Sequence, residues 1–160
     1  MIGSGGSPAY RGAVVRCPAC GEVMRAEMTR SAPLEVCDAC EGVWLDWFDG
    51  EVATVAVEHE AARLDRGSSP PSRPSRVVSG SGACPRCTRP LVAELYRFAD
   101  ISAHDLITGV ELLRCPECAG AFVPRGSAHL LLERVRERRT QSPTEALRAL
   151  VRQLFGRDRG

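Results

Sequence analysis

The sequence predicts a small α+β protein whose fold depends on bound metal and which contains two similar units in tandem. Three observations predict this class. Only 5% of the 160 residues are aromatic, which leaves little material for one large core. Eight cysteines form four Cys-x-x-Cys pairs, two in each half of the chain. The residues around the pairs also recur, so the chain contains an internal duplication.

The repeat is clearest at the cysteine pairs. Cys17-Pro-Ala-Cys20 corresponds to Cys84-Pro-Arg-Cys87. Cys37-Asp-Ala-Cys40-Glu-Gly-Val-Trp-Leu45 corresponds to Cys115-Pro-Glu-Cys118-Ala-Gly-Ala-Phe-Val123. Between the copies Gly, Ser and Pro dominate, which is typical of a flexible linker. The predicted order is a disordered N-terminus at 1–13, a first unit at 14–66, the linker at 67–83, a second unit at 84–139 and a C-terminal helix at 142–156.

Short apolar segments predict a hairpin between the two cysteine pairs of each unit. In the first unit, residues 22–29 and 34–36 suit the hairpin, and residues 42–45 predict a third strand. In the second unit, residues 91–98 and 110–113 would pair across a longer loop. The hairpin is therefore the part of the repeat that varies in length.

Capping residues predict a helix after each unit. Asp46 or Asp49 could cap the first helix, which would run to about Arg66. Ser127 could cap the second, over about 128–138. Each helix carries apolar side chains at helical spacing, so we expect one face of each to be buried.

A third helix is predicted at 142–156. Ser142 suits the N-cap, Pro143 the first helical position, and Glu145 completes a capping box. The apolar stripe comprises Leu147, Leu150, Val151, Leu154 and Phe155. This amphipathic helix could dock on the rest of the chain, pair between chains in an oligomer, or contact a membrane surface.

The cysteines predict two metal centres. Two Cys-x-x-Cys turns can direct four sulfurs at one ion, and Zn²⁺ suits the closed tetrahedral shell that results. Because the duplication favours sequential sites, we expect one structural zinc ion in each unit, and residues 1–70 should bind one zinc alone. The expected ligands are Cys17, Cys20, Cys37 and Cys40 for one ion, and Cys84, Cys87, Cys115 and Cys118 for the other.

These residues resemble the small bacterial zinc ribbons named after the N-terminal ribbon of transcription factor IIB. The resemblance rests on Cys17-Pro-Ala-Cys20-Gly21, on Cys37-Asp-Ala-Cys40-Glu-Gly-Val-Trp-Leu-Asp46, and on the following Gly50-Glu51-Val52. It covers about 17–64, with a weaker second copy at 84–135. The resemblance implies two tandem zinc ribbons, each with three short strands around a zinc ion, and it carries over only the eight ligands.

Aromatic residues and histidines near the metal sites have mostly structural interpretations. Trp44 and Phe122 occupy equivalent positions and should pack over the metal sites. Trp47 and Phe48 follow so closely that not all these rings can face one small core, which predicts an exposed apolar patch. The histidines have no ligand spacing to the cysteine pairs and are interpreted as ordinary residues: His59, His104 and His129.

Composition restricts the remaining function classes. The chain has 21 basic residues, all Arg, against 20 acidic ones, and two tetrathiolate zinc sites would change the formal charge from +1 to −3. This balance argues against broad coating of nucleic acid, although Arg134, Arg138 and Arg139 could make a local contact. No stretch approaches the roughly 18–20 apolar residues of a membrane span, and no secretion signal is evident, so we expect a cytoplasmic protein.

The sequence thus favours a non-enzymatic zinc adaptor that binds a protein partner. No Gly-rich phosphate loop, nucleophile elbow or paired-histidine motif is present, and a closed four-sulfur site offers no position for water or substrate. A nucleic-acid-binding or transcription-associated module is the first alternative. A rubredoxin-like iron electron carrier is the second, because such sites also use two Cys-x-x-Cys turns.

Overall fold

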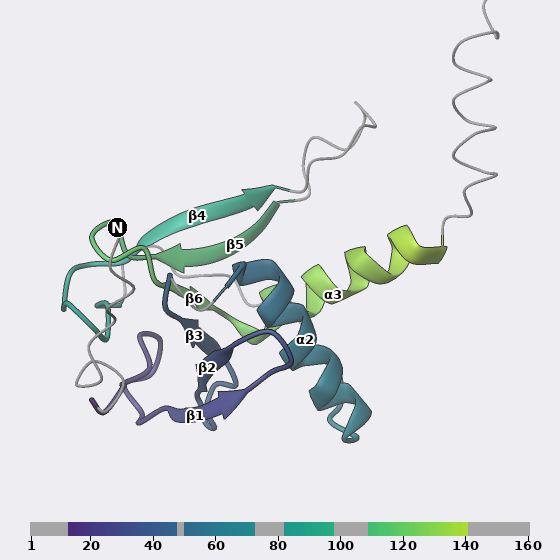
Figure 1. Ribbon diagram of the computed structural model, residues 1–160, viewed down its shortest axis with the longest axis horizontal. Helices are drawn as coiled ribbons and strands as arrows, with labels where there is room; N and C mark the ends of the chain where they lie inside the picture. Colours follow the sequence, from purple (N-terminus) through teal and green to yellow (C-terminus); the bar gives the residue numbers. More distant parts are fainter. Residues whose placement is uncertain (1–12, 48–49, 73–81, 98–108, 141–160) are drawn as a thin grey trace, which may run out of the picture.

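The computed structural model describes residues 13–47, 50–72, 82–97 and 109–140 (Figure 1). Within these ranges the first unit contains a hairpin, a third strand and a helix, and the second unit repeats that order. The elements are β1 (Arg25–Met28), β2 (Pro33–Val36), β3 (Val43–Leu45), α2 (Val52–Asp65), β4 (Val92–Arg97), β5 (Gly109–Arg114), β6 (Ala121–Val123) and α3 (Arg125–Thr140). The predicted α+β class, both hairpins and the third strand of the first unit are confirmed.

All six strands form one antiparallel sheet in the order β1-β2-β3-β6-β5-β4 (Figure 1). The two units join at the centre, where β3 pairs with β6 and Trp44 lies opposite Phe122. These two residues occupy equivalent positions in the repeat, so the pairing is related by an approximate two-fold axis. Joining the third strands therefore turns two small ribbons into one sheet.

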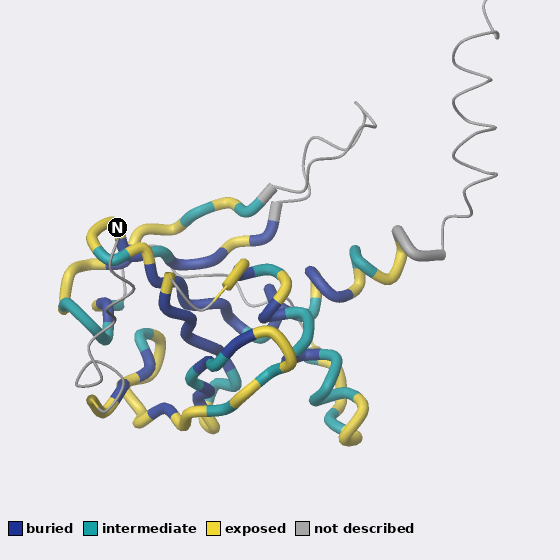
Figure 2. Tube along the Cα trace, viewed as in Figure 1, coloured by how far each residue is buried: buried dark blue, intermediate teal, exposed yellow. Residues whose placement is uncertain are grey.

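Every residue of the central strands β3 and β6 is buried, as the dark segments in Figure 2 show, so both faces of these strands are covered. On one face, Val43 and Leu45 pack with α2 and α3 in a shared apolar cluster. On the other face, Trp44 packs with Phe122 and the buried cysteines. Since successive side chains of a strand point to opposite faces, a three-residue strand that is apolar throughout requires cover on both sides.

Helix α2 starts later than predicted, and its cap is Glu51. The Glu51 carboxylate accepts hydrogen bonds from the backbone N–H groups of Ala53 (3.1 Å) and Thr54 (2.7 Å). The prediction that Asp46 caps this helix is wrong, because Asp46 is buried and accepts a hydrogen bond from Trp44 Nε1 at 3.1 Å. The alternative prediction, Asp49, is also wrong, because Glu51 occupies the cap position; Asp49 itself lies outside the described residues.

Helix α3 starts earlier than predicted, so the assignment of Ser127 as its cap is also wrong. The Pro124 carbonyl accepts a hydrogen bond from the Ala128 N–H at 3.0 Å, and the helix begins directly after Pro124. Ser127 therefore lies inside the first turn, and its hydroxyl donates to the Glu111 carbonyl at 2.6 Å. This bond attaches α3 to β5.

Several predictions fall outside the described residues. They concern most of the N-terminal segment, residues 73–81 of the linker, residues 98–108, Phe48 and the helix at 142–156. Among the helices that the structure describes, none has the length and apolar character needed to span a bilayer.

Candidate metal centres

The same tight turn recurs at each of the four cysteine pairs. The N–H of the first cysteine donates to the carbonyl five residues later, and its own carbonyl accepts from the N–H four residues later, at 2.8–3.0 Å. The residue four positions after that cysteine has positive φ in every case: Gly21, Glu41, Thr88 and Ala119. A left-handed residue at this position closes the turn and directs both cysteine side chains to the same side.

The four turns bring the eight predicted cysteines together in two groups. Cys17, Cys20, Cys37 and Cys40 form one group, and Cys84, Cys87, Cys115 and Cys118 form the other. All sulfurs within a group lie within 4.8 Å of one another, and the shortest Sγ–Sγ distances are 3.4 Å. A zinc ion with Zn–S bonds of about 2.3 Å separates its sulfurs by about 3.8 Å. The donor set and the spacing of both groups therefore fit one tetrahedral zinc ion each.

Within each group, the first cysteine of a pair is buried and the second is more accessible. Cys17, Cys37, Cys84 and Cys115 are buried, whereas Cys20 is exposed and the other three are half-buried. Backbone N–H groups approach the buried sulfurs: Cys40 N lies 3.5 Å from Cys37 Sγ, and Arg86 N lies 3.4 Å from Cys84 Sγ. Such donors stabilise the negative charge of a thiolate ligand.

Close sulfur contacts, burial and nearby backbone N–H groups shift the pKa of several cysteine thiols. The bond from Cys17 lowers the pKa of Cys40 to about 5, and the same contact together with burial raises the pKa of Cys17. Burial opposes ionisation of Cys115, but the N–H groups of Cys118 and Glu117 outweigh it and lower its pKa to about 7. A cation at the centre of each group would replace the remaining thiol protons, so metal binding releases protons.

Trp44 and Phe122 pack beside the metal groups, and each ring reaches into the opposite unit. A Cβ atom added to Gly42 would lie 2.4 Å from Phe122 Cζ, and one added to Gly120 would lie 2.4 Å from Trp44 Cζ2. Each ring thus covers the glycine that follows the second cysteine pair of the other unit. The sequence predicted packing over the metal sites but not this exchange between the units.

A buried ion pair also crosses between the units, and sequence reasoning missed it. Arg86 lies between Cys84 and Cys87, and its side chain is only 3% exposed. Its Nη2 lies 2.6 Å from Glu35 Oε1 and 2.7 Å from Asp46 Oδ2, both in the first unit. The only sequence signal is a difference between the repeats, since Ala19 occupies the position that corresponds to Arg86.

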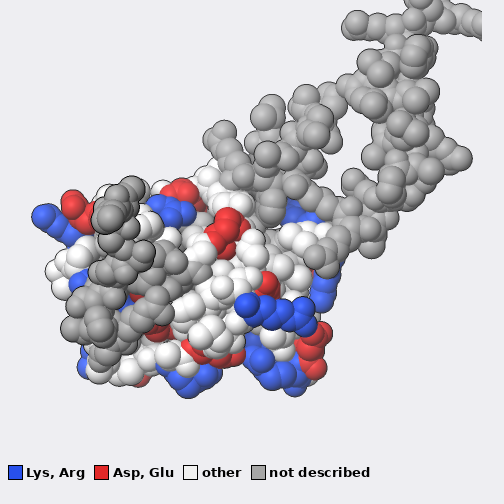
Figure 3. Space-filling model, in the orientation of Figure 1, with Lys and Arg blue, Asp and Glu red and all other residues white. Residues whose placement is uncertain are grey.

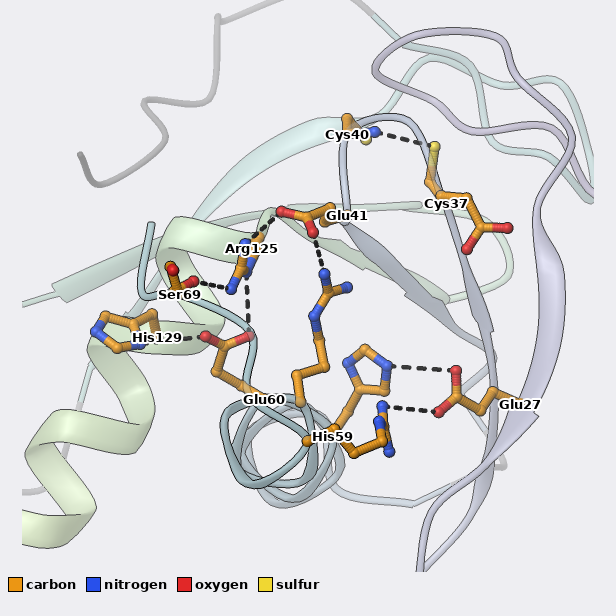
Figure 4. A network of polar contacts seen from close by, with 12 residues as sticks. Glu27, Cys37, Cys40, Glu41, His59, Glu60, Ser69, Arg125 and His129 are labelled. Atoms are coloured by element: carbon orange, nitrogen blue, oxygen red, sulfur yellow. Dashed lines mark hydrogen bonds and ion pairs between the residues drawn. The ribbon is translucent and has the colours of Figure 1, made fainter. Parts of the chain in front are cut away.

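A second polar network links the second cysteine turn of the first unit to both helices (Figure 4). Glu41, which follows the ligand Cys40, pairs with Arg63 of α2 and Arg125 of α3. Arg125 also lies 3.5 Å from the buried Glu60, which contacts His129 at 3.2 Å. These contacts hold α2 of the first unit against α3 of the second.

The histidines do not join a metal group within the described part of the chain. His59 is buried and its Nε2 lies 3.6 Å from Glu27 Oε2 (Figure 4). Burial lowers the pKa of His59, partly offset by the Glu27 carboxylate. His129 contacts Glu60 as described, whereas His104 lies outside the described residues.

Of the three Arg residues predicted to make a local nucleic-acid contact, the structure describes the side chain of Arg134. Arg134 Nη1 lies 3.0 Å from Glu137 Oε2 one turn along α3, which agrees with a helix face that pairs with itself. Arg138 and Arg139 are part of α3, but their side chains are outside the described set.

Comparison with known proteins finds a similarity in the first unit only. Residues 16–50 match the family described as transcription factor zinc-finger. The match does not extend to the second group of cysteines, which the structure nevertheless arranges in the same way. Neither a curated protein nor a solved structure matches the chain. The family match at 16–50 and the two groups of four sulfurs together support two structural zinc ions, one in each unit.

Proposed function

We propose that this protein is a non-enzymatic zinc adaptor that binds a protein partner in a groove between its two units. The groove measures about 490 Å³ and lies between the end of β1, helix α2 and the second half of α3. Its apolar lining comprises Met28, Val57, Ala61, Ala62, Leu132 and Val135. This groove is the observation that carries the proposal, because it combines apolar and charged side chains from both zinc-stabilised units in one concave surface.

The charges around the groove favour a protein segment over a polyanion. Three acidic residues, Glu27, Glu58 and Asp65, line it together with Arg30, Arg66 and Arg136. A partner helix with an apolar stripe and flanking charges of both signs would complement this rim, whereas a phosphate backbone would meet three carboxylates. Figure 3 shows Arg and acidic side chains intermixed on the described part of the visible face.

Two strongly exposed apolar side chains, one of them in the groove, support a contact with protein. Met28, at the edge of the groove, is 71% exposed, and Trp47 is 65% exposed. Methionine and tryptophan are both enriched at protein interfaces, so these exposed side chains favour a protein partner.

A nucleic-acid or transcription-associated role is the second candidate, and the family match of residues 16–50 is the observation that favours it. Against broad phosphate binding, several Arg side chains are engaged with carboxylates of the same chain: Arg63, Arg86, Arg114, Arg125 and Arg134. A local contact through Arg134, Arg138 and Arg139 is what this candidate would require. The sulfur groups alone would also accept iron, which visible colour in the purified protein would reveal.

The adaptor proposal includes the absence of catalysis and a cytoplasmic location. A zinc ion held by four thiolates has no open coordination position at which water could be activated. A reducing compartment would also keep the eight thiols available for metal.

A photo-crosslinking amino acid placed at Ala61 tests the groove, with the same substitution at the exposed Val92 of β4 as the control position. The captured protein is then purified and titrated against the zinc-loaded chain, Ala62→Glu in the groove and Val92→Glu outside it. We expect Ala62→Glu to weaken binding at least tenfold, with Val92→Glu close to the unmodified chain. Equal binding by both variants would show that the partner does not bind in the groove.

A salt series with duplex DNA and single-stranded RNA tests the second candidate. Nucleic-acid binding should weaken steeply between about 50 and 200 mM salt and should also weaken in Arg134→Ala. If such binding is found while no groove partner survives purification, the adaptor proposal fails and the alternative replaces it.

A further inference from the structure

The two zinc sites lie on one continuous set of buried side chains. A single apolar cluster contains the rings of Trp44 and Phe122 and the buried cysteines of both groups: Cys17, Cys37, Cys84 and Cys115. The exchange of rings means that the position of Trp44 depends on the turn that carries Gly120, and the position of Phe122 on the turn that carries Gly42. Each of these turns supplies ligands to one ion and packing for the other unit.

Arg86 adds an ionic connection between the second metal site and the first unit. Because it lies between two ligands of the second site, the closing of that turn around zinc fixes where its side chain emerges. Its guanidinium then meets Glu35 and Asp46, two carboxylates that are largely buried in the first unit. If the second site were open, these carboxylates would be left near the core without their cation, which is unfavourable.

We propose that the two zinc sites bind their ions cooperatively, so that occupation of one site raises the affinity of the other. Each unit is too small to fold without metal, so zinc binding and folding are coupled in each. When either unit is disordered, the other unit loses its contacts across the sheet. These contacts are the β3–β6 pairing, the exchanged rings and the ion pair of Arg86. The coupling free energy between the sites is therefore the free energy of the contacts that join β3 to β6 and Arg86 to the first unit. This inference is independent of which partner the protein binds.

Zinc titration of the reduced, metal-free full chain, followed by native mass spectrometry, tests the proposal directly. At one equivalent of zinc per chain and at exchange equilibrium, two independent sites leave about half of the molecules with one ion, or more if the sites differ in affinity. A tenfold coupling lowers that fraction to about a quarter. A one-zinc fraction below one half supports cooperativity. A fraction of one half or more overturns it when the first site also keeps its zinc affinity after the second site is disabled.

A matched pair of variants locates the coupling. Arg86→Ala removes the buried connection, whereas Arg89→Ala removes an exposed Arg from the same cysteine turn. We expect the one-zinc fraction to rise in Arg86→Ala and to stay at the wild-type value in Arg89→Ala. Equal fractions in both variants would remove Arg86 from the mechanism.

Disabling one site gives a second measurement that does not depend on how Arg86→Ala folds. In the double variant Cys84→Ser and Cys87→Ser, competition with a chromophoric chelator reports the zinc affinity of the first site. Cooperativity predicts an affinity at least tenfold weaker than in the full chain. An unchanged affinity would show that the first ribbon forms without the second and would overturn the proposal.

Discussion

At the scale of single residues, Gly42 and Gly120 have a steric role that backbone conformation does not explain. The described glycines with positive φ do not include Gly42 or Gly120. A Cβ atom at either position would nevertheless overlap an aromatic ring of the other unit. The repeat therefore carries glycine here because the rings of Phe122 and Trp44 need the space.

Gly42→Ala should destabilise the zinc-loaded protein by about 1–3 kcal/mol, because an added methyl group in a close-packed core forces the rigid Phe122 ring to move. Chemical denaturation of the zinc-loaded chain measures the loss. Phe122→Leu in the same chain should restore part of it, since the smaller side chain vacates the space. Strictly additive losses in the double variant would show that the two residues do not contact each other.

His59 gives the molecule a dependence on pH that is separate from the cysteines. Burial lowers its pKa, so the unfolded chain, with a histidine pKa of about 6.5, binds the proton more readily than the folded chain. The free energy of unfolding should therefore fall as the pH drops through about 6.5 and below. In His59→Gln this contribution disappears, while the response of the zinc sites is the same.

The measurement is the difference in unfolding free energy between wild type and His59→Gln from pH 7.5 to 5.5. We expect the wild type to lose stability more steeply than the variant over this range. Parallel curves would show that His59 titrates alike in the folded and unfolded chains.

At the scale of elements, the hairpins were predictable and the starts of the helices were not. Each hairpin is bounded by cysteine turns only a few residues away, so local pattern was sufficient. The start of α2 depended on a distant residue, because Asp46 pairs with Arg86, 40 positions along the chain. An acidic residue near a helix start is a good cap by propensity, but a buried cation takes precedence.

The cap of α2 also connects the element to the second unit. The Glu51 carboxylate accepts from Ala53 and Thr54 and from the Tyr96 hydroxyl, at 3.1 Å, in β4. Burial opposes ionisation of Glu51, but these hydrogen bonds outweigh it and keep its pKa below the usual value. The cap therefore remains charged at neutral pH.

Glu51→Ala should lower the stability of the zinc-loaded protein by about 1 kcal/mol, the usual cost of removing an N-cap. Thermal unfolding measures it, and Glu22→Ala, an exposed acidic residue outside the helices, is the matched control. Equal melting temperatures for the two variants would show that α2 does not depend on this cap.

At the scale of the whole molecule, the sequence predicted two units but not their joining. The sequence did contain a signal, since Val43-Trp44-Leu45 and Ala121-Phe122-Val123 are apolar at every position. Such strands need cover on both faces and neighbours on both edges, but pattern alone does not say which strand provides the missing edge. The shared sheet also argues against the expectation that residues 1–70 fold alone with one zinc, because Trp44 would lose its partners in the second unit.

The two units should remain together when the chain between them is cut. A protease site introduced within residues 73–81 allows cleavage after the zinc-loaded protein has folded. We expect the two pieces to co-elute in size-exclusion chromatography, because β3–β6 pairing, the exchanged rings and the Arg86 ion pair hold them without a covalent link. With a chelator the pieces should separate, since both units lose their fold with the metal. The uncut chain under the same conditions controls for changes in shape. If the pieces separate while zinc is bound, the linker and not the shared core keeps the ribbons in contact.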